Sequence, residues 1–341
     1  MKHQLMAEPK RIAPCCNFKG NIPLDDYHNQ IEQYLQQLDQ GIKIPECRLC
    51  WESEDNGFVS VRQSGNQDYH TFEGNGTTYL DIRLDNECNL ACNMCSSDFS
   101  TLWGKLKGHG LLTLTQSRIE QIRSLALDLK RVSIQGGEPF YGNRYIDFIN
   151  SLPNKKQISI DIFSNIITAN TQVIQQWIHQ FKKVNINASV DGYQQSYDSI
   201  RWPTTWNKWS RKAVQLHELH NLTINYFYCI QADNVLSIVD FVNWRNTFTP
   251  HRHIVFTPVY HEDITYQSLT VDERDQFLSQ EQQLISLMHA DSREYQEIKS
   301  FIELVKQMTP NNQMIKQRRD FNNLVNRMRS NYRNKINTSS N

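Results

Sequence analysis

The stretch of sequence that decides the fold is TYLDIRL (residues 78–84), which continues through DNE into CNLACNMC (residues 88–95). Apolar and charged residues alternate in its first part, as is typical of a strand with one apolar and one polar face. The apolar face holds Leu80, Ile82 and Leu84, and the polar face holds Asp81 and Arg83. We therefore predict a strand over residues 78–84 that leads straight into a loop with three cysteines.

The spacing of these cysteines, C-x3-C-x2-C, points to a metal centre. Thiolates crowded onto one short loop suit an iron–sulfur cluster, because soft sulfur ligands hold iron well. A four-iron cluster usually takes four cysteines, so Cys88, Cys92 and Cys95 would leave one iron with an open coordination position. The alternatives are zinc ligation, although zinc sites usually take four ligands in two pairs, and burial as small core residues.

Predicted strands and helices alternate along the chain as far as residue 260. After the first strand, the strands are expected at 131–135, 158–163, 184–190, 222–230 and 253–257, and the helices at 115–128, 171–181, 206–220 and 235–244. This alternation predicts a parallel sheet with right-handed crossovers. Six such units are too few for the eight-stranded barrel, so we expect an α/β fold with a partial (β/α)6 barrel. Active sites in such folds lie at the carboxyl ends of the strands, which is where the cysteine loop falls.

Three further strand ends carry small or polar residues. The second strand is followed by Gly136-Gly137-Glu138-Pro139, whose glycines allow the backbone to approach a ligand closely and permit positive φ. The other residues of this kind are Ser164 and Asn165 after the third strand, Ser189 after the fourth, and Arg201 shortly beyond it. Small polar side chains can bind hydroxyl groups and an arginine fork can bind a carboxylate, whereas plain loop capping is the alternative for each residue.

The C-x3-C-x2-C loop and the GGEP segment together resemble the signatures of the radical S-adenosylmethionine (radical SAM) enzymes. The resemblance implies a [4Fe–4S] cluster on Cys88, Cys92 and Cys95, whose open iron binds the amino and carboxylate groups of S-adenosylmethionine. One electron then cleaves a carbon–sulfur bond, and the resulting 5′-deoxyadenosyl radical abstracts hydrogen from a substrate. It also implies an electron donor such as flavodoxin or ferredoxin, and it leaves any catalytic side chain unknown.

The same resemblance assigns contacts to S-adenosylmethionine. Met94 would lie against the adenine, and the segment Gly136, Gly137 and Glu138 would hold the amino group. The polar residues at the later strand ends would contact the ribose, the methionyl part or its carboxylate: Ser164, Asn165, Ser189 and Arg201. For Met94 a simple hydrophobic plug is the alternative.

Residues 1–77 form a separate region with four cysteines, which are Cys15, Cys16, Cys47 and Cys50. The segment PECRLCW (residues 45–51) and the residues after it, Glu54, Gly57, Ser60 and Arg62, resemble the twitch module, a shortened auxiliary-cluster domain of the SPASM type. This resemblance implies a second iron–sulfur cluster on Cys47, Cys50 and one or both of Cys15 and Cys16. Zinc stays open because C-x2-C is a common zinc half-site. Lys10 and Arg11 stand where that family often has glycine, so the fourth ligand is undecided.

Composition excludes several classes of protein. The chain has 341 residues and a formal net charge of zero, so it has no overall electrostatic attraction to nucleic acid or anionic membranes. No run of eighteen apolar residues predicts a transmembrane helix, and the N-terminus lacks the apolar core of a secretion signal. Eight cysteines without such a signal favour reduced thiols in a cytoplasm. Cys229 lies within an apolar run and is expected to be a core residue.

The C-terminal segment reads as helical and polar. Phe321, Leu324, Val325 and Met328 follow the spacing i, i+3, i+4, i+7 and predict one buried stripe. Residues 316–335 contain seven basic residues and one acidic residue, which is typical of a solvated face, with nucleic-acid contact as a minor alternative. We thus expect a twitch-like region at 1–77, the partial barrel at 78–265 and a helical extension at 266–341.

The sequence therefore predicts a radical SAM enzyme that acts on a peptide or protein. The substrate class follows only from analogy with relatives that carry such modules. The alternatives are a radical SAM enzyme acting on a small molecule, nucleotide or RNA, and a non-enzymatic iron–sulfur or zinc-binding interaction protein.

Overall fold

The computed structural model describes residues 4–55, 60, 62–63 and 77–339. Within them, eight strands form one sheet in the order β2-β1-β3-β4-β5-β6-β7-β8. The strands are β1 (Gln4–Glu8), β2 (Arg11–Ala13), β3 (Tyr79–Arg83), β4 (Arg131–Gln135), β5 (Ser159–Ser164), β6 (Lys183–Ser189), β7 (Leu222–Ile230) and β8 (His253–Pro258). All neighbouring strands are parallel except β1 and β2, which are antiparallel. The predicted α/β partial barrel is confirmed.

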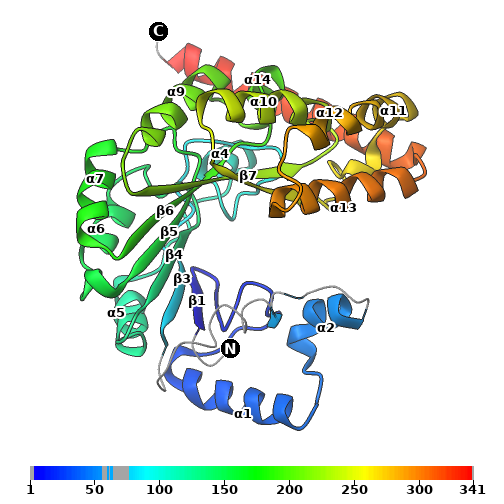
Figure 1. Ribbon diagram of the computed structural model, residues 1–341. Coiled ribbons are helices and arrows are strands. Elements are labelled where there is room, and N and C mark those ends of the chain that lie inside the picture. The colour runs from blue at the N-terminus through cyan, green and yellow to red at the C-terminus, as the bar shows by residue number, and fades with distance from the viewer. Residues whose placement is uncertain (1–3, 56–59, 61, 64–76, 340–341) are drawn as a thin grey trace.

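Helices cover the outer, convex side of the curved sheet (Figure 1). The barrel helices are α4 (Thr101–Lys107), α5 (Gln116–Leu125), α6 (Arg144–Asn150), α7 (Thr171–Gln180), α8 (Gln195–Ile200), α9 (Trp206–His217) and α10 (Ile238–Phe248). The predicted strands at 131–135 and 222–230 are confirmed to the residue, and the other predicted elements of the barrel are shifted by a few residues at their ends. The short helices α4, α6 and α8 were not predicted, because six or seven residues are too few to establish a helical period.

The two faces of the sheet differ in chemistry. Alternate residues of β3 to β7, such as Ile82, Ile134 and Ile162, are buried in the main hydrophobic core. The opposite, concave face carries a polar row that runs across five paired strands: Asp81, Ser133, Asp161, Asn185 and Thr223. Hydrogen bonds join neighbouring side chains of this row, for example from Asn185 Nδ2 to Asp161 Oδ1 at 2.7 Å. Similar bonds join side chains of the row that follows it along the strands. The partial barrel therefore has a polar interior.

The N-terminal region is joined to the barrel through the sheet itself. It contains α1 (Tyr27–Asp39), a short 3-10 turn at Pro45–Cys47 and α2 (Arg48–Asp55). Strand β1 pairs in parallel with β3, with Leu5 opposite Leu80 and Ala7 opposite Ile82. This pairing was not predicted, because a parallel contact between segments so far apart leaves no local pattern. The expected boundary near residue 77 thus separates two segments that share one sheet.

The C-terminal segment is helical, as predicted, with α11 (Val271–Ser279), α12 (Glu281–Ser286), α13 (Arg293–Gln307) and the long α14 (Asn312–Ser339). The predicted stripe on α14 is partly confirmed. Val325 is buried, and Phe321 and Met328 pack against buried residues, whereas Leu324 lies at the margin of the stripe and is exposed. The basic face is only partly solvated, because Arg318 forms ion pairs with Asp233 and Glu273. No helix in the described part of the chain is long and apolar enough to span a membrane.

Candidate functional site

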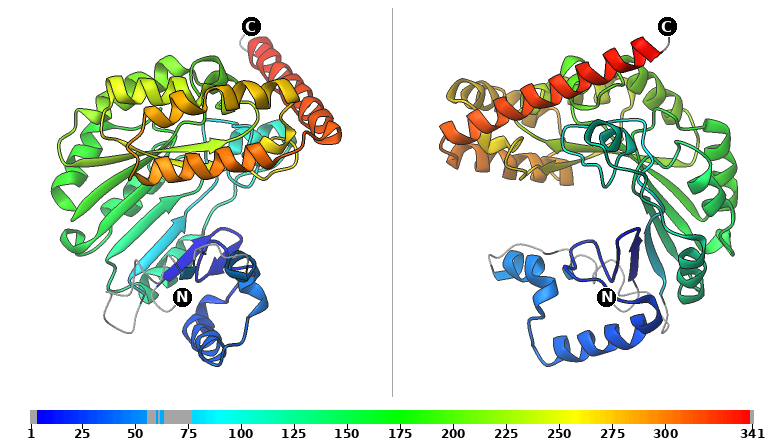
Figure 2. Two further views of the ribbon diagram at one scale, coloured as in Figure 1. Left: turned by 45° about the vertical axis from the view of Figure 1, so that its right-hand side comes forward. Right: turned by 180° about the vertical axis from the view of Figure 1, so that it is seen from behind.

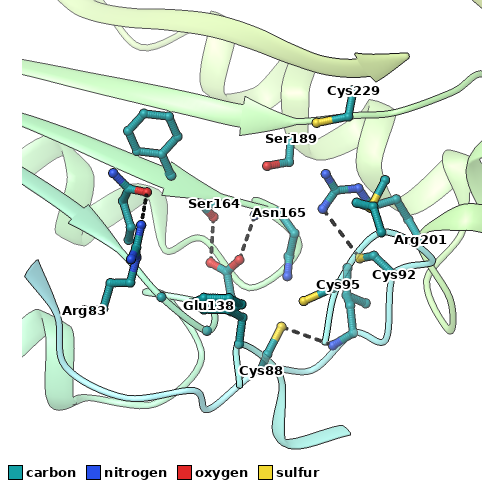
Figure 3. Close-up of a pocket in the computed structure, with 17 residues that line it drawn as sticks. Arg83, Cys88, Cys92, Cys95, Glu138, Ser164, Asn165, Ser189, Arg201 and Cys229 are labelled. Atoms are coloured by element: carbon teal, nitrogen blue, oxygen red, sulfur yellow. Dashed lines mark hydrogen bonds between the residues drawn. The ribbon is translucent and has the colours of Figure 1, made fainter. Parts of the chain in front are cut away.

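A pocket of about 500 Å³ lies at the carboxyl ends of the barrel strands (Figure 3). It brings together all the residues that the sequence assigned to the catalytic cluster and its cofactor: Cys88, Cys92, Met94, Cys95, Gly136, Gly137, Glu138, Ser164, Asn165, Ser189 and Arg201. These residues come from four consecutive strand ends, those of β3 to β6, so the fold and not a single loop creates the site. Residues 15, 16, 47 and 50 do not line this pocket.

The cysteine loop is held in place by the helix that follows it. Ser100 caps the amino end of α4 and also donates a hydrogen bond to the carbonyl of Leu90 at 2.5 Å. The indole of Trp103 donates to the carbonyl of Cys92 at 2.8 Å, and the amide of Cys88 donates to Thr101 Oγ1 at 3.1 Å. Because these bonds fix backbone groups of Cys88, Leu90 and Cys92, the amino end of α4 holds the backbone of the cysteine loop.

The chain between α8 and α9 holds the opposite side of the same loop. The amide of Ala91 donates to the carbonyl of Trp202 at 2.8 Å, and the amide of Asn93 donates to the carbonyl of Ile200 at 3.0 Å. Ala91 is fully buried against Leu102 and Trp103. The backbone of the loop is therefore paired on two sides, as buried polar groups must be.

The Gly136-Gly137 segment is required for contact with the cysteine loop. The amide of Gly137 donates to the carbonyl of Asp85 at 3.1 Å, and the amide of Glu138 donates to the carbonyl of Glu87 at 2.7 Å. A Cβ atom on Gly137 would lie 2.0 Å from the carbonyl oxygen of Glu87. Gly136 has a φ of +123°, which disfavours any other residue. The two glycines thus let β4 and the cysteine loop approach each other.

Glu138 connects the end of β4 to the end of β5. Its buried carboxylate accepts hydrogen bonds from Ser164 Oγ at 2.6 Å, from the amide of Asn165 at 2.7 Å and from the amide of Phe140 at 3.1 Å. Burial raises the pKa of Glu138 to about 7, although the three donors act in the opposite direction. Asn165 in turn donates to Asn89, between the first two cysteines, at 2.8 Å. This network fixes the relative positions of three strand ends.

Arg201 lies beside the cysteines and is balanced by a carboxylate. One of its terminal nitrogens pairs with the fully buried Asp191, and the other lies 3.6 Å from the sulfur of Cys92. Its buried Nε has no hydrogen-bond partner among the described residues. The second oxygen of Asp191 accepts from the amide of Cys229 at 2.6 Å. Arg201 therefore places a positive charge beside Cys92, and its Nε has no partner among the described residues.

Cys229 lines the pocket and is not a core residue, contrary to the sequence prediction. Buried and partly exposed residues alternate along β7, and Cys229 belongs to the partly exposed, concave set. Burial raises the pKa of its thiol, and the nearby Asp191 adds to this. Sequence reasoning also missed three polar or aromatic residues that form the floor of the pocket on the concave face of the sheet: Arg83, Gln135 and Phe163.

The three loop cysteines fit an iron–sulfur cluster by their donor chemistry. Burial raises the pKa of Cys88 well above its ordinary value and that of Cys95 to about 12, so without a cation both would be neutral thiols. Among the described residues, no three His, Cys, Asp or Glu side chains lie close enough together to hold a single metal ion. The three sulfurs share a pocket without converging on one point, which suits a cubane because each thiolate binds a different iron.

The pocket also fits S-adenosylmethionine. A cofactor with an ammonium, a carboxylate, ribose hydroxyls and an adenine needs both polar and apolar contacts. The side chain of Arg201, the strand-end residue Ser189 and the apolar side chains of Leu90 and Met94 supply both kinds within one cavity. The carboxylate of Glu138 and the hydroxyl of Ser164 are instead engaged with each other, so in this structure they shape the cavity wall.

Electrostatic effects couple the N-terminal cysteines to one another. Burial raises the pKa of Cys47 to about 12, and the charges of Cys15 and Cys50 add to this effect. Burial also raises the pKa of Cys15 and of Cys16. The charge of Cys50 adds to this effect at Cys15, and the charge of Cys15 adds to it at Cys16, whose side chain is exposed. Cys15, Cys47 and Cys50 thus act on one another electrostatically, and the exposed Cys16 is coupled to Cys15.

The residues after Cys50 that resemble the twitch module interact with one another. The carboxylate of Glu54 accepts hydrogen bonds from Ser60 Oγ at 2.5 Å and from Arg62 at 2.6 Å. The Arg62 guanidinium lies 4.4 Å from the ring centre of Trp51. Gly57 lies outside the described residues. The contacts are consistent with a small folded unit around Cys47 and Cys50.

No protein-family model and no curated protein matches this chain. Solved structures that are similar to it include native anSMEcpe with bound AdoMet and Kp18Cys peptide, which is 17% identical, with a TM-score of 0.42 over 66% of this chain and 62% of that chain. SuiB of Streptococcus suis bound to S-adenosylmethionine is 14% identical, with a TM-score of 0.41 over 84% of this chain and 60% of that chain. TYW1 with a lysine-pyruvate adduct is 19% identical, with a TM-score of 0.34 over 60% of this chain and 70% of that chain.

The chain spans about three-fifths of the length of anSMEcpe and SuiB. All three TM-scores are below 0.5, so the function proposed below rests on the geometry of the pocket.

Proposed function

We propose that this chain is a radical SAM enzyme. One observation carries the proposal: three cysteine thiols, the side chain of Arg201 and the polar ends of β5 and β6 share one cavity at the carboxyl edge of a partial barrel. Cys88, Cys92 and Cys95 would hold a [4Fe–4S] cluster. When bound, the cluster and S-adenosylmethionine would supply one-electron cleavage of a carbon–sulfur bond and a radical able to abstract hydrogen.

The residues of the chain would prepare the site for this chemistry. Arg201 keeps positive charge beside Cys92, where thiolates gather. The network around Glu138 keeps the end of β5 at a fixed distance from the cysteine loop. Apolar side chains in the wall, including Leu90, Phe99 and Phe163, would limit the access of water to a reactive radical.

We further propose a peptide or protein as the substrate. The support is the concave face of the sheet, where hydrogen-bonding side chains lead from the floor of the pocket along the strands. Gln135 Nε2 lies 3.2 Å from Asp81 Oδ2, and Asn225 Nδ2 lies 3.0 Å from Asn187 Oδ1. Amide and carboxyl groups arranged in this way suit the amides of a polypeptide backbone, since they can both donate and accept hydrogen bonds.

A second iron–sulfur cluster on Cys15, Cys47 and Cys50 is part of the proposal. The mutual influence of these thiols supports it, and so does the exposure of Cys16, which argues against that residue as a ligand. The remaining position would be open to substrate or filled by another ligand. The electron would come from a flavodoxin or ferredoxin in a cytoplasm, where the thiols stay reduced.

The test is reductive cleavage of S-adenosylmethionine. Protein reconstituted anaerobically with iron and sulfide, and then reduced with dithionite, should produce 5′-deoxyadenosine. The variant with Cys88, Cys92 and Cys95 replaced by Ala should produce none and should keep roughly half the iron, at the second site. A wild type with intact clusters that yields no 5′-deoxyadenosine would favour a non-enzymatic iron–sulfur protein. Bound zinc in place of iron would exclude the cluster.

The substrate class can be tested separately. Short peptides encoded next to the gene should be modified in the presence of S-adenosylmethionine and dithionite, as mass spectrometry would show. RNA serves as the competing probe. The geometry does not favour RNA, because Arg318 on the basic helix is paired with Asp233 and Glu273. Modification of RNA and not of peptides would overturn the substrate proposal and leave the radical SAM proposal intact.

A further inference from the structure

Arg329 of the C-terminal helix reaches the cysteine loop. It is buried, and one of its terminal nitrogens donates to the carbonyl of Ala91 at 2.6 Å and to Asn93 Oδ1 at 2.7 Å. The other donates to the carbonyl of Ser199 in α8 at 2.7 Å. Ala91 and Asn93 are the two neighbours of Cys92 in the chain. A single guanidinium thus binds the backbone carbonyl of Ala91 on one side of Cys92 and the side chain of Asn93 on the other side.

Apolar packing holds α14 against the loop. Val325 belongs to a small buried cluster with Ala91, Leu102, Trp103 and Trp202, and this cluster is separate from the main core. Figure 2 shows α14 running past the segment that contains the loop and α4. The Arg329 guanidinium also lies over the ring of Trp202, at 5.4 Å from its centre. The position of Arg329 is therefore set by the helix and not by the arginine alone.

The charge of Arg329 has no carboxylate partner among the described residues. Its acceptors are two backbone carbonyls and an amide oxygen, all of which are neutral. Arg201, by contrast, is balanced by Asp191. A buried cation without an anion is costly, and burial lowers the pKa of Arg329 to about 10. The thiolate of Cys92, which belongs to the proposed cluster, is an anion that acts electrostatically on Arg329.

We propose that Arg329 is a positioning residue for the catalytic cluster, orienting the loop around Cys92 and offsetting the negative charge of the cluster. The inference rests on the proposed function. A [4Fe–4S]²⁺ cluster with three thiolates carries a net charge of −1, and one electron from dithionite makes it −2. A positive charge nearby stabilises the reduced state more than the oxidised state, because it attracts the larger negative charge more strongly. The C-terminal helix would thereby raise the reduction potential of the cluster.

The experiment uses the full chain, reconstituted anaerobically, with the substitutions Arg329→Gln and Arg329→Lys. Arg327→Gln is the matched control, because it removes the same charge from an exposed position of the same helix. The midpoint potential is measured by dithionite titration with electron paramagnetic resonance. The signal of the loop cluster is identified by its absence from the variant that lacks Cys88, Cys92 and Cys95.

We expect Arg329→Gln to lower the midpoint potential and to make iron loss to a chelator roughly tenfold faster, as is typical when an outer-shell contact of a metal site is removed. Arg329→Lys should keep the potential, because it keeps the charge, but should still lose iron faster because it has fewer donors. Arg327→Gln should behave as the wild type. An unchanged potential in Arg329→Gln, or an equal shift in Arg327→Gln, would refute the role of the charge.

If Arg329→Gln does not fold, Arg329→Lys tests both the effect of the charge on the potential and the positioning of the loop. A lowered potential in that variant would exclude the charge effect, and iron retention equal to that of the wild type would exclude the positioning effect. A wild type that binds no cluster at the loop would instead refute the proposed function itself.

Discussion

Gly137→Ala should separate β4 from the cysteine loop. The added Cβ would lie 2.0 Å from the carbonyl oxygen of Glu87, 2.6 Å from its carbonyl carbon and 2.7 Å from the carbonyl carbon of Asn86. Ordinary contacts begin near 3.4 Å, so a displacement of about 1.4 Å must be absorbed, and the atoms concerned are backbone atoms that cannot rotate away. Overpacking of this kind costs about 1–3 kcal/mol.

The displacement would also break two hydrogen bonds. The bonds from the amides of Gly137 and Glu138 to the carbonyls of Asp85 and Glu87 each contribute about 1 kcal/mol. The free energy of unfolding should thus fall by about 3–5 kcal/mol, which corresponds to a fall in Tm of about 4–7 °C for a chain of this length. Since the movement begins one residue before Cys88, iron at the loop and cleavage of S-adenosylmethionine should be lost as well.

The assay is thermal unfolding of the metal-free protein, followed by the iron content after reconstitution. Gly110→Ala is the control, because nothing lies within 4 Å of its added Cβ. A Gly137→Ala variant with the Tm and the iron content of the control would show that the loop and the GGEP segment do not depend on close contact.

Three further predictions concern buried polar groups and the N-terminal cysteines. Burial raises the pKa of Asp81 from 3.8 to about 6, so the free energy of unfolding should fall as pH rises through that window. Denaturant unfolding should show a loss of about 2 kcal/mol between pH 4 and pH 7, and Asp81→Asn should abolish it. Ser164→Ala removes a donor from the Glu138 carboxylate and should cost about 1–3 kcal/mol in the same assay, whereas an unchanged stability would argue against the network. Cys47→Ala should eliminate iron from the N-terminal site, whereas Cys16→Ala should keep it; equal losses in iron analysis would contradict the grouping proposed here.

Local patterns in the sequence were enough to predict the six barrel strands β3 to β8 and the pocket, whereas β1 and β2 were missed. The alternation in residues 78–84 and the spacing of Cys88, Cys92 and Cys95 are short-range features, and parallel strands bring their carboxyl ends together in any such sheet. The alternation also contained a signal that was missed. In β7, Asn225, Phe227 and Cys229 occupy one face and Ile224, Tyr226 and Tyr228 the other, so the pocket-facing position of Cys229 could have been found.

Long-range contacts could not be predicted in this way. Arg329 and Ala91 are 238 residues apart, and no periodicity in α14 distinguishes an arginine that binds a distant carbonyl from one that faces solvent. The same holds for Glu138, whose carboxylate is used by Ser164 and Asn165 of the next strand. The identity of a partner depends on which elements are adjacent in space, and that is settled only by the packing of the whole fold.

The pairing of β1 with β3 covers an edge of the sheet that could otherwise associate with other molecules. Without β1, the strand that feeds the cysteine loop would be the rim of the sheet, with the backbone amides and carbonyls of Leu80 to Ile82 free to recruit a strand from another molecule. The N-terminal region therefore shields the most chemically sensitive strand from polymerisation. A shortened protein that starts at residue 78 should self-associate even before any metal is added, so the catalytic core is best studied with its first strand in place.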